Sequence, residues 1–167
     1  MLAQAVAAIA LGLMATSGVA KFVDPDPTTG AMRAARLPAS TPVTYALGVI
    51  ESTVAVLALV VGGPAVLAGA LLYGGFTIFT LAATLYDFPI QSCGCFGRAD
   101  TPPSRLHVVF NLMATLALGR LAILGMGPID WSLPAMDLVL FLGFAIAGVF
   151  ASYLLLAQLP QVTTRRA

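Results

Sequence analysis

The sequence predicts an all-α integral membrane protein, a bundle of five transmembrane helices with a short interfacial helix in the first loop. Its 167 residues are 59% hydrophobic and only 9% charged, with a mean hydropathy of +0.97. A soluble domain, by contrast, is roughly a quarter charged. Five apolar stretches also reach the length of about 20 residues that a helix needs to cross a bilayer. A chain of this composition cannot cover itself with a water-facing surface.

Turn residues separate the five predicted spans. Each span is expected to be helical, because backbone groups in lipid must hydrogen-bond within their own segment. Breaks fall at Asp24 to Pro27, at Gly62 to Pro64 and at Gly125 to Pro128. No internal repeat or composition break is visible, so residues 1–167 are expected to form one domain. The expected spans are 2–23, 42–61, 64–88, 104–126 and 134–159.

The first span resembles a secretory signal in one respect. Gly18-Val19-Ala20 offers the small residues that a signal peptidase requires. However, the residues before the span include no Lys or Arg, and a positive n-region is part of such a signal. We therefore expect the span to be retained as a helix.

The loops sort into two faces. Loops 24–41 and 89–103 and the C-terminal tail share one face, whereas the N-terminus, the 62–63 turn and loop 127–133 share the other. Basic residues crowd the first face, which the positive-inside rule makes cytoplasmic. They are Lys21, Arg33, Arg36, Arg98, Arg105, Arg165 and Arg166, against Arg120 near the second face. Residues 28–37 are expected to form the short interfacial helix, with snorkelling arginines.

The most specific local motif is a cysteine pair separated by one glycine. Cys93-Gly94-Cys95-Phe96-Gly97 lies in the loop between the third and fourth spans. Two thiols this close form a disulfide only if the backbone bends, which Gly94 permits. Strained, exposed disulfides are the ones that exchange readily. Arg98, Arg105 and the helix start at residues 101–104 favour a reactive thiolate.

The same motif has other interpretations. A Cys-Gly-Cys pair on its own is equally typical of a static disulfide or of two small residues packed in a loop. A zinc site is disfavoured, because two thiols with only His107 nearby leave a tetrahedral site short of a ligand. We therefore predict no metal.

Ionisable residues inside the spans form a second candidate feature. Glu51 lies about nine residues into the second span. Since a helix rises about 1.5 Å per residue, it is expected about 14 Å from the membrane face that carries the cysteine loop. Charges at that depth are costly and usually functional. We predict a buried carboxyl group that is protonated or paired, with Lys21, His107 and Asn111 as candidate partners. A transporter with Glu51 as proton carrier is less favoured, because no inverted repeat or broken helix is visible.

Polar residues also recur at helical spacing on two spans. We interpret the threonines as helix packing, a common use of hydroxylated residues in membranes. Gly143 and Ala147 on the fifth span are assigned to packing as well. His107 is the only histidine, and a proton shuttle near the thiols competes with a structural role. The stripes are Tyr73, Thr77, Thr80, Thr84 and Asp87 on the third span, and Ser104, His107, Asn111 and Thr115 on the fourth.

These motifs together resemble the MauE/DoxX group of redox-associated membrane proteins, and MauE more closely. The similarity rests on residues 17–22, on Glu51, on residues 93–98 and on the helix start at residues 104–111. It implies a small helical bundle that acts in methylamine utilisation beside a thioredoxin-like partner. There it would help to form disulfides in the small subunit of an exported amine dehydrogenase.

The resemblance is carried by individual residues to different degrees. Cys93 and Cys95 match the motif directly, and Lys21 and Glu51 match by position. His107 and Asn111 are added from their spacing alone. Maturation of an exported enzyme would place the cysteines outside the cell, whereas the basic residues place them inside, so both orientations stay open.

The expected function is therefore thiol–disulfide exchange at Cys93 and Cys95, supported by Glu51, Lys21, Arg98, His107 and Asn111. The expected setting is the cytoplasmic membrane of a bacterium, with the lipid bilayer and a thioredoxin-like protein as partners. A single thiol pair needs an electron acceptor such as a quinone, which four aromatic residues of the third span could border. An accessory subunit of a larger membrane complex is the alternative, and a net charge of +1 disfavours nucleic acid. The aromatic residues are Tyr73, Phe76, Phe79 and Tyr86.

Overall fold

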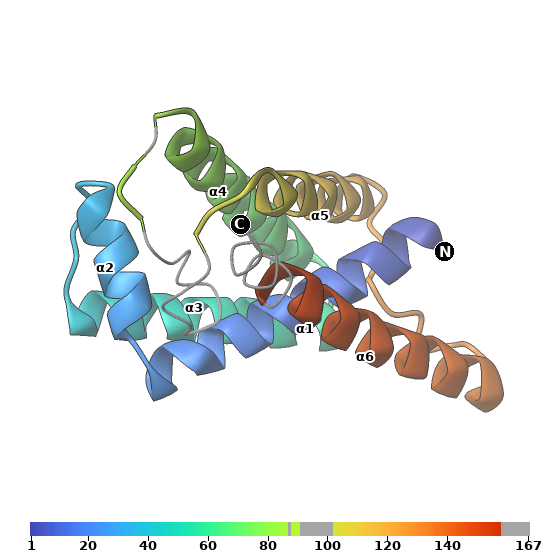
Figure 1. The fold of residues 1–167 in the computed structure, drawn as a ribbon. Helices are drawn as coiled ribbons and strands as arrows, with labels where there is room; N and C mark the ends of the chain where they lie inside the picture. Colours follow the sequence, from blue (N-terminus) through green and yellow to red (C-terminus); the bar gives the residue numbers. More distant parts are fainter. Residues whose placement is uncertain (87, 91–101, 158–167) are drawn as a thin grey trace.

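The protein folds as six helices, seen in a computed structural model that describes residues 1–86, 88–90 and 102–157. No strand occurs among these residues. Five of these helices are long, and Figure 1 shows the short one at the edge of the bundle. The helices are α1 (Leu2–Val23), α2 (Asp26–Ala34), α3 (Thr41–Val60), α4 (Pro64–Leu85), α5 (Arg105–Ile123) and α6 (Ala135–Ala157).

The five long helices are each long and apolar enough to cross a membrane. This confirms the predicted five-helix membrane bundle. The helix ends differ from the predicted ones by up to three residues, most at the C-terminal ends of α4 and α5. Gly125 explains one difference: its φ of +64° is a left-handed conformation, which suits glycine and ends α5 early.

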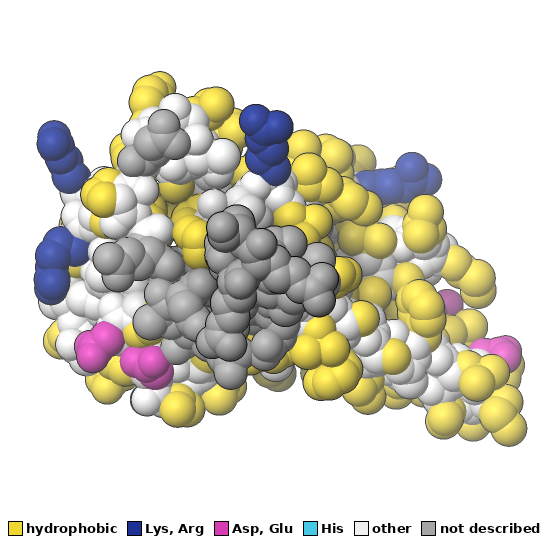
Figure 2. Space-filling view, viewed as in Figure 1, with side chains coloured by type: hydrophobic (Ala, Val, Ile, Leu, Met, Phe, Trp, Pro, Cys, Tyr) yellow, Lys and Arg dark blue, Asp and Glu magenta, His cyan; other side chains and the backbone are white. Residues whose placement is uncertain are grey.

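The short helix α2 lies in the first loop, where a short helix is predicted over residues 28–37, but it begins two residues earlier and ends three residues earlier. Thr29 ties it to α3, because its hydroxyl lies 2.8 Å from the hydroxyl of Thr44. Arg33 and Arg36 are exposed, and Figure 2 shows basic side chains at the edge that α2 forms. Arg36 adopts a φ of +58°, and Leu37 N–H donates to the Met32 carbonyl oxygen, which together terminate the helix.

Four helices, α1, α3, α4 and α5, build the apolar core. Small residues are common in it, and they let helix backbones approach closely, as is typical inside membranes. One tertiary hydrogen bond crosses the core, from the Tyr73 hydroxyl on α4 to the Ala10 carbonyl oxygen on α1. The buried core residues are Ala7, Ala10, Leu11, Met14, Ala55, Ala58, Val66, Ala70, Tyr73, Ala114, Leu118 and Leu121.

Helix α6 packs along α1 and leaves most of its surface exposed. Only 6% of its spanning window is buried inside the bundle. At Gly12 the helices nearly touch, since an added Cβ would lie 2.5 Å from Cγ2 of Val149. The prediction that Gly143 and Ala147 pack is wrong: both are exposed, and a Cβ on Gly143 would meet nothing within 4 Å among the described residues. The packed small residues of α6 include instead Gly148, against Ile9, and Ala145, which is buried.

The two ends of the bundle contain the chain segments that the predicted topology assigns to them. At one end, Gln4 Nε2 donates to the Gly127 carbonyl oxygen at 3.4 Å, and Gly62 lies beside Gly127. The exposed Trp131 belongs to the same end. At the other end, Ile90 packs against Ala31 of α2. The described parts of the loops therefore fall into the two expected sets.

Candidate functional site

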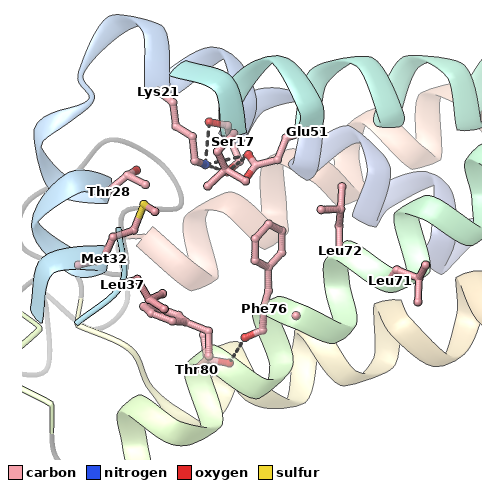
Figure 3. A pocket seen from close by; sticks show the side chains of 14 residues that line it. Ser17, Lys21, Thr28, Met32, Leu37, Glu51, Leu71, Leu72, Phe76 and Thr80 are labelled. Carbon is pink, nitrogen blue, oxygen red and sulfur yellow. Dashed lines mark hydrogen bonds and ion pairs between the residues drawn. The ribbon is translucent and has the colours of Figure 1, made fainter. Parts of the chain in front are cut away.

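A buried polar cluster joins α1 to α3 at the centre of the site. Lys21 Nζ lies 2.8 Å from Glu51 Oε2, and only 3% and 1% of the two side chains are exposed. Ser17 completes the cluster: its hydroxyl accepts from Lys21 Nζ at 2.8 Å and donates to Glu51 Oε2 at 3.0 Å. Figure 3 shows the three side chains converging. The structure thus selects Lys21 from the three partners expected for Glu51.

Two glycines, Gly18 on α1 and Gly48 on α3, determine where this polar cluster forms. A Cβ on Gly18 would lie 2.8 Å from the Gly48 carbonyl oxygen, so α1 and α3 are in backbone contact there. Ser17 and Lys21, four residues apart, share one face of α1, and Gly48 and Glu51, three residues apart, share one face of α3. The close approach therefore brings the ammonium and carboxylate groups within hydrogen-bonding distance.

The ion pair carries no net charge, which lowers the free-energy cost of burying it in an apolar bundle. An unpaired charge at mid-span would be far more costly. The second carboxylate oxygen of Glu51, however, lies outside this hydrogen-bond network. Glu51 Oε1 is buried and has no hydrogen-bond partner among the described residues. A buried polar atom without a partner costs about 1–3 kcal/mol, so this oxygen is a natural contact point for a bound molecule.

A cavity of about 280 Å³ opens directly below the cluster. Ser17, Lys21 and Glu51 form its polar end, and apolar side chains of α2 and α4 face them. Figure 3 shows Phe76 and Leu72 on α4 across the cavity from the ion pair. The other lining residues are Thr28, Ala31, Met32, Leu37, Leu47, Leu71, Gly75, Phe79 and Thr80. The cavity is therefore suited to a largely apolar molecule with one polar group.

The four aromatic residues expected near a quinone lie in different places. Phe76 and Phe79 line the 280 Å³ cavity. Tyr73 instead turns toward α1 and borders a smaller cavity. Tyr86 is 73% exposed and stacks on Phe88. Only two of the four can contact a molecule in the larger cavity.

His107 is buried at the start of α5, one turn inside the helix. Its Nδ1 lies 2.9 Å from the hydroxyl of Ser104, the N-cap residue. It does not reach Glu51 through any hydrogen bond recorded in the described chain. A small cavity of about 30 Å³, however, borders both His107 and Ser17. That volume can hold a water molecule, because one water needs roughly 10–15 Å³.

Asn111 contacts α4, not the ion pair. Its Nδ2 donates to Thr80 Oγ1 at 3.5 Å, and Thr115 lies 3.4 Å from Thr77 one turn further on. The two predicted polar stripes thus face each other across the α4–α5 contact. This agrees with the packing role expected for the threonines.

Cys93, Cys95 and Arg98 lie outside the described residues, as does Asp87. The two flanks of their loop are described. Ile90 is buried against α2 and α4, and Ser104 is the N-cap residue of α5, without a side-chain capping hydrogen bond. Among the described residues, no group of three His, Cys, Asp or Glu side chains could hold a metal ion.

Ser17 and Gly48 are the site residues that sequence reasoning missed. Ser17 was visible only as part of a motif, and its link to Glu51 spans 34 residues. The available signal was the shared pattern of a small residue followed within one turn by an ionisable one: Gly18 before Lys21, and Gly48 before Glu51. Two such patterns on neighbouring spans indicate a close crossing with a polar centre.

The fold and site define a multi-pass membrane protein, with a buried ion pair and a cavity at the level of its spanning helices. The family model described as "Methylamine utilisation protein MauE" matches residues 1–127. The chain belongs to this family, and membership implies an accessory membrane protein of methylamine utilisation. The matched region covers α1 to α5 and stops before α6. No curated protein and no solved structure matches the chain.

Proposed function

We propose that the protein is a thiol–disulfide exchange protein of the bacterial cytoplasmic membrane. It would act with a thioredoxin-like partner to form disulfides in an exported enzyme of the methylamine dehydrogenase type. The observation that carries this proposal is the pair Cys93 and Cys95 in a chain of the MauE family. They are the only two cysteines of the chain, so any exchange must use them.

The exchange needs no other group to balance. A thiolate of the partner attacks one sulfur of the Cys93–Cys95 disulfide, and the other sulfur leaves as a thiolate. The second partner thiol then attacks the mixed disulfide and releases the reduced pair. The partner becomes oxidised, the pair becomes reduced, and two protons and two electrons are conserved across the sum.

Two features of the described chain support this chemistry. Arg105 is the first residue of α5, so its positive charge and the helix N-terminus both lie at the end of the loop. Each stabilises a thiolate in its vicinity. Ile90 is held in a buried apolar cluster, which anchors the opposite flank of the loop.

Thiol trapping in native membranes tests the proposal. Cys93→Ser and Cys95→Ser leave one thiol each, and we expect one variant, but not the other, to accumulate a mixed disulfide with a thioredoxin-like protein. The asymmetry arises because attacking and resolving thiols differ. The double variant is the control for the adduct.

An accessory role without exchange predicts a different outcome. In that case neither variant forms an adduct, and the double variant still supports maturation of the dehydrogenase. This pair of results would replace the exchange function with a stabilising one.

A further inference from the structure

We infer that the 280 Å³ cavity beneath the Lys21–Glu51 pair binds the ring of a membrane quinone. The role of the quinone as electron acceptor for Cys93 and Cys95 rests on the proposed function, whereas the binding of quinone to the cavity does not. The inference joins three observations: the size and lining of the cavity, its opening toward the lipid, and a buried, unpartnered oxygen on Glu51, one of the residues that form its polar end.

The size of the cavity suits a substituted six-membered ring. A cavity of about 150 Å³ admits benzene, and this one has a volume of about 280 Å³. Its walls combine Phe76 and Phe79 with aliphatic side chains such as Leu47 and Leu72. Aromatic and aliphatic walls with a few convergent polar groups are typical of small-molecule sites.

The entrance lies on the lipid side. Leu71 lines the cavity although 69% of it is exposed, and Gly75, one turn further along α4, lines it and is exposed too. Both lie within the membrane-spanning part of α4. A ligand that enters there arrives through the bilayer, so it must be lipophilic.

The polar end suits a molecule that alternates between carbonyl and hydroxyl. Glu51 Oε1 has no partner in the described chain and can accept a hydrogen bond from a quinol hydroxyl. Lys21 makes two bonds of 2.8 Å and a third, longer one of 3.4 Å to the Ser17 carbonyl oxygen. A quinone carbonyl can replace that third acceptor. An acyl chain could fill the walls but would leave both groups unchanged.

The electron balance fits the thiol pair. Oxidation of the Cys93–Cys95 dithiol breaks two S–H bonds, forms one S–S bond and releases two electrons and two protons. A quinone takes up the same two electrons and two protons and becomes a quinol. Ile90, three residues before Cys93, packs in one cluster with Ala31 and Phe79, which both line the cavity. The chain therefore connects the thiol segment to the wall of this site.

A matched pair of glycine substitutions tests binding. Gly75 and Gly143 both lie in spanning helices, and a Cβ on either would meet nothing within 4 Å among the described residues. Gly75→Leu adds bulk at the cavity, whereas Gly143→Leu adds it on the exposed face of α6. Both should therefore fold, which thermal unfolding verifies.

The probe is radiolabelled decylubiquinone, titrated into quinone-free protein in lipid nanodiscs. We expect saturable binding to wild type and to Gly143→Leu, and at least tenfold weaker binding to Gly75→Leu. Glu51→Gln keeps the shape of the side chain and should weaken binding severalfold. Equal binding by the two leucine variants overturns the inference. It is also overturned if a phospholipid displaces the probe as effectively as unlabelled quinone does.

A second readout separates this inference from the proposed function. The double Cys93→Ser/Cys95→Ser variant should bind decylubiquinone as wild type does, because neither thiol is needed for binding. In wild type, added decylubiquinone should convert the dithiol to a disulfide, and Gly75→Leu should slow this at least tenfold. If the mixed disulfide forms but no quinone binds, the inference fails and the exchange function stands. If quinone binds but no adduct ever forms, the site stands and the exchange function fails.

Discussion

Gly18 and Gly48 touch where α1 crosses α3, and the ion pair forms beside this contact, since a Cβ on Gly48 would lie 3.2 Å from the Cβ of Lys21. A Cβ on Gly48 would lie 2.8 Å from the Gly18 carbonyl oxygen, and one on Gly18 would lie equally close to the Gly48 carbonyl oxygen. Backbone atoms cannot move aside as a flexible side chain can. The two helices can therefore approach this closely only because neither glycine has a Cβ atom.

Alanine at either glycine should push the helices apart. We expect Gly18→Ala and Gly48→Ala to lower the free energy of unfolding by about 1–3 kcal/mol, the usual cost of overpacking. Gly75→Ala and Gly143→Ala, in open space, should change it by less than about 1 kcal/mol. Denaturation in a detergent titration measures both sets. Equal effects in the two sets would show that the contact does not limit helix approach.

The Lys21–Glu51 pair should show strong energetic coupling. Lys21→Met and Glu51→Leu each leave one buried charge unpaired, which we expect to cost roughly 3–5 kcal/mol. The double variant removes both charges and should lose less than either single variant. A double-mutant cycle on unfolding free energies gives the coupling. If the stability loss of the double variant equals the sum of the two single losses, the two charges do not stabilise each other and the pair is solvated in the membrane.

Asn111 and Thr80 should couple weakly by the same measurement. Their donor and acceptor are 3.5 Å apart, at the limit of a hydrogen bond. Interhelical hydrogen bonds in membranes average about 0.6 kcal/mol. We expect the cycle of Asn111→Leu and Thr80→Val to give a coupling below about 1 kcal/mol. A larger value would place these residues in the functional network instead of in packing.

The topology predicts that three segments share one membrane face: α2, the cysteine loop and the segment after α6. A compartment-specific reporter fused after Ala167 and another inserted between Ile90 and Pro102 should give the same signal. A reporter inserted in the turn at Gly62-Gly63 should give the opposite one. The same experiment decides the orientation, which charge and family resemblance predict differently. Opposite signals from the first two fusions would contradict five spans.

The sequence predicted the helices well because each span is an independent apolar run. Lipid requires backbone pairing inside the segment, so length and hydropathy suffice. The short helix α2 was predicted from the pattern of residues 28–37, in which arginines alternate with apolar residues. Errors were confined to helix ends, where Gly125 adopts a left-handed conformation that ends α5 before its apolar run does.

The contacts between spans were harder to predict. Glu51 was expected to be buried and paired, but the choice of Lys21 over His107 and Asn111 depends on which helix faces cross. That choice is made by the Gly18–Gly48 approach, a property of two segments 30 residues apart in the sequence. The exposed faces of Gly143 and Ala147 show the converse: small residues at helical spacing permit close packing but do not require it.

The single tryptophan of the chain, Trp131, lies in the loop between α5 and α6, at the end of the bundle opposite α2. It is 52% exposed, and tryptophan favours the boundary between hydrocarbon and lipid headgroups. Intrinsic fluorescence therefore reports from one known end of the molecule, without any engineered label. Quenching by lipids brominated at different depths would measure how deeply that end sits in the bilayer. Together with the lengths of the spans, this fixes the depth of Glu51 by a route that involves neither thiol.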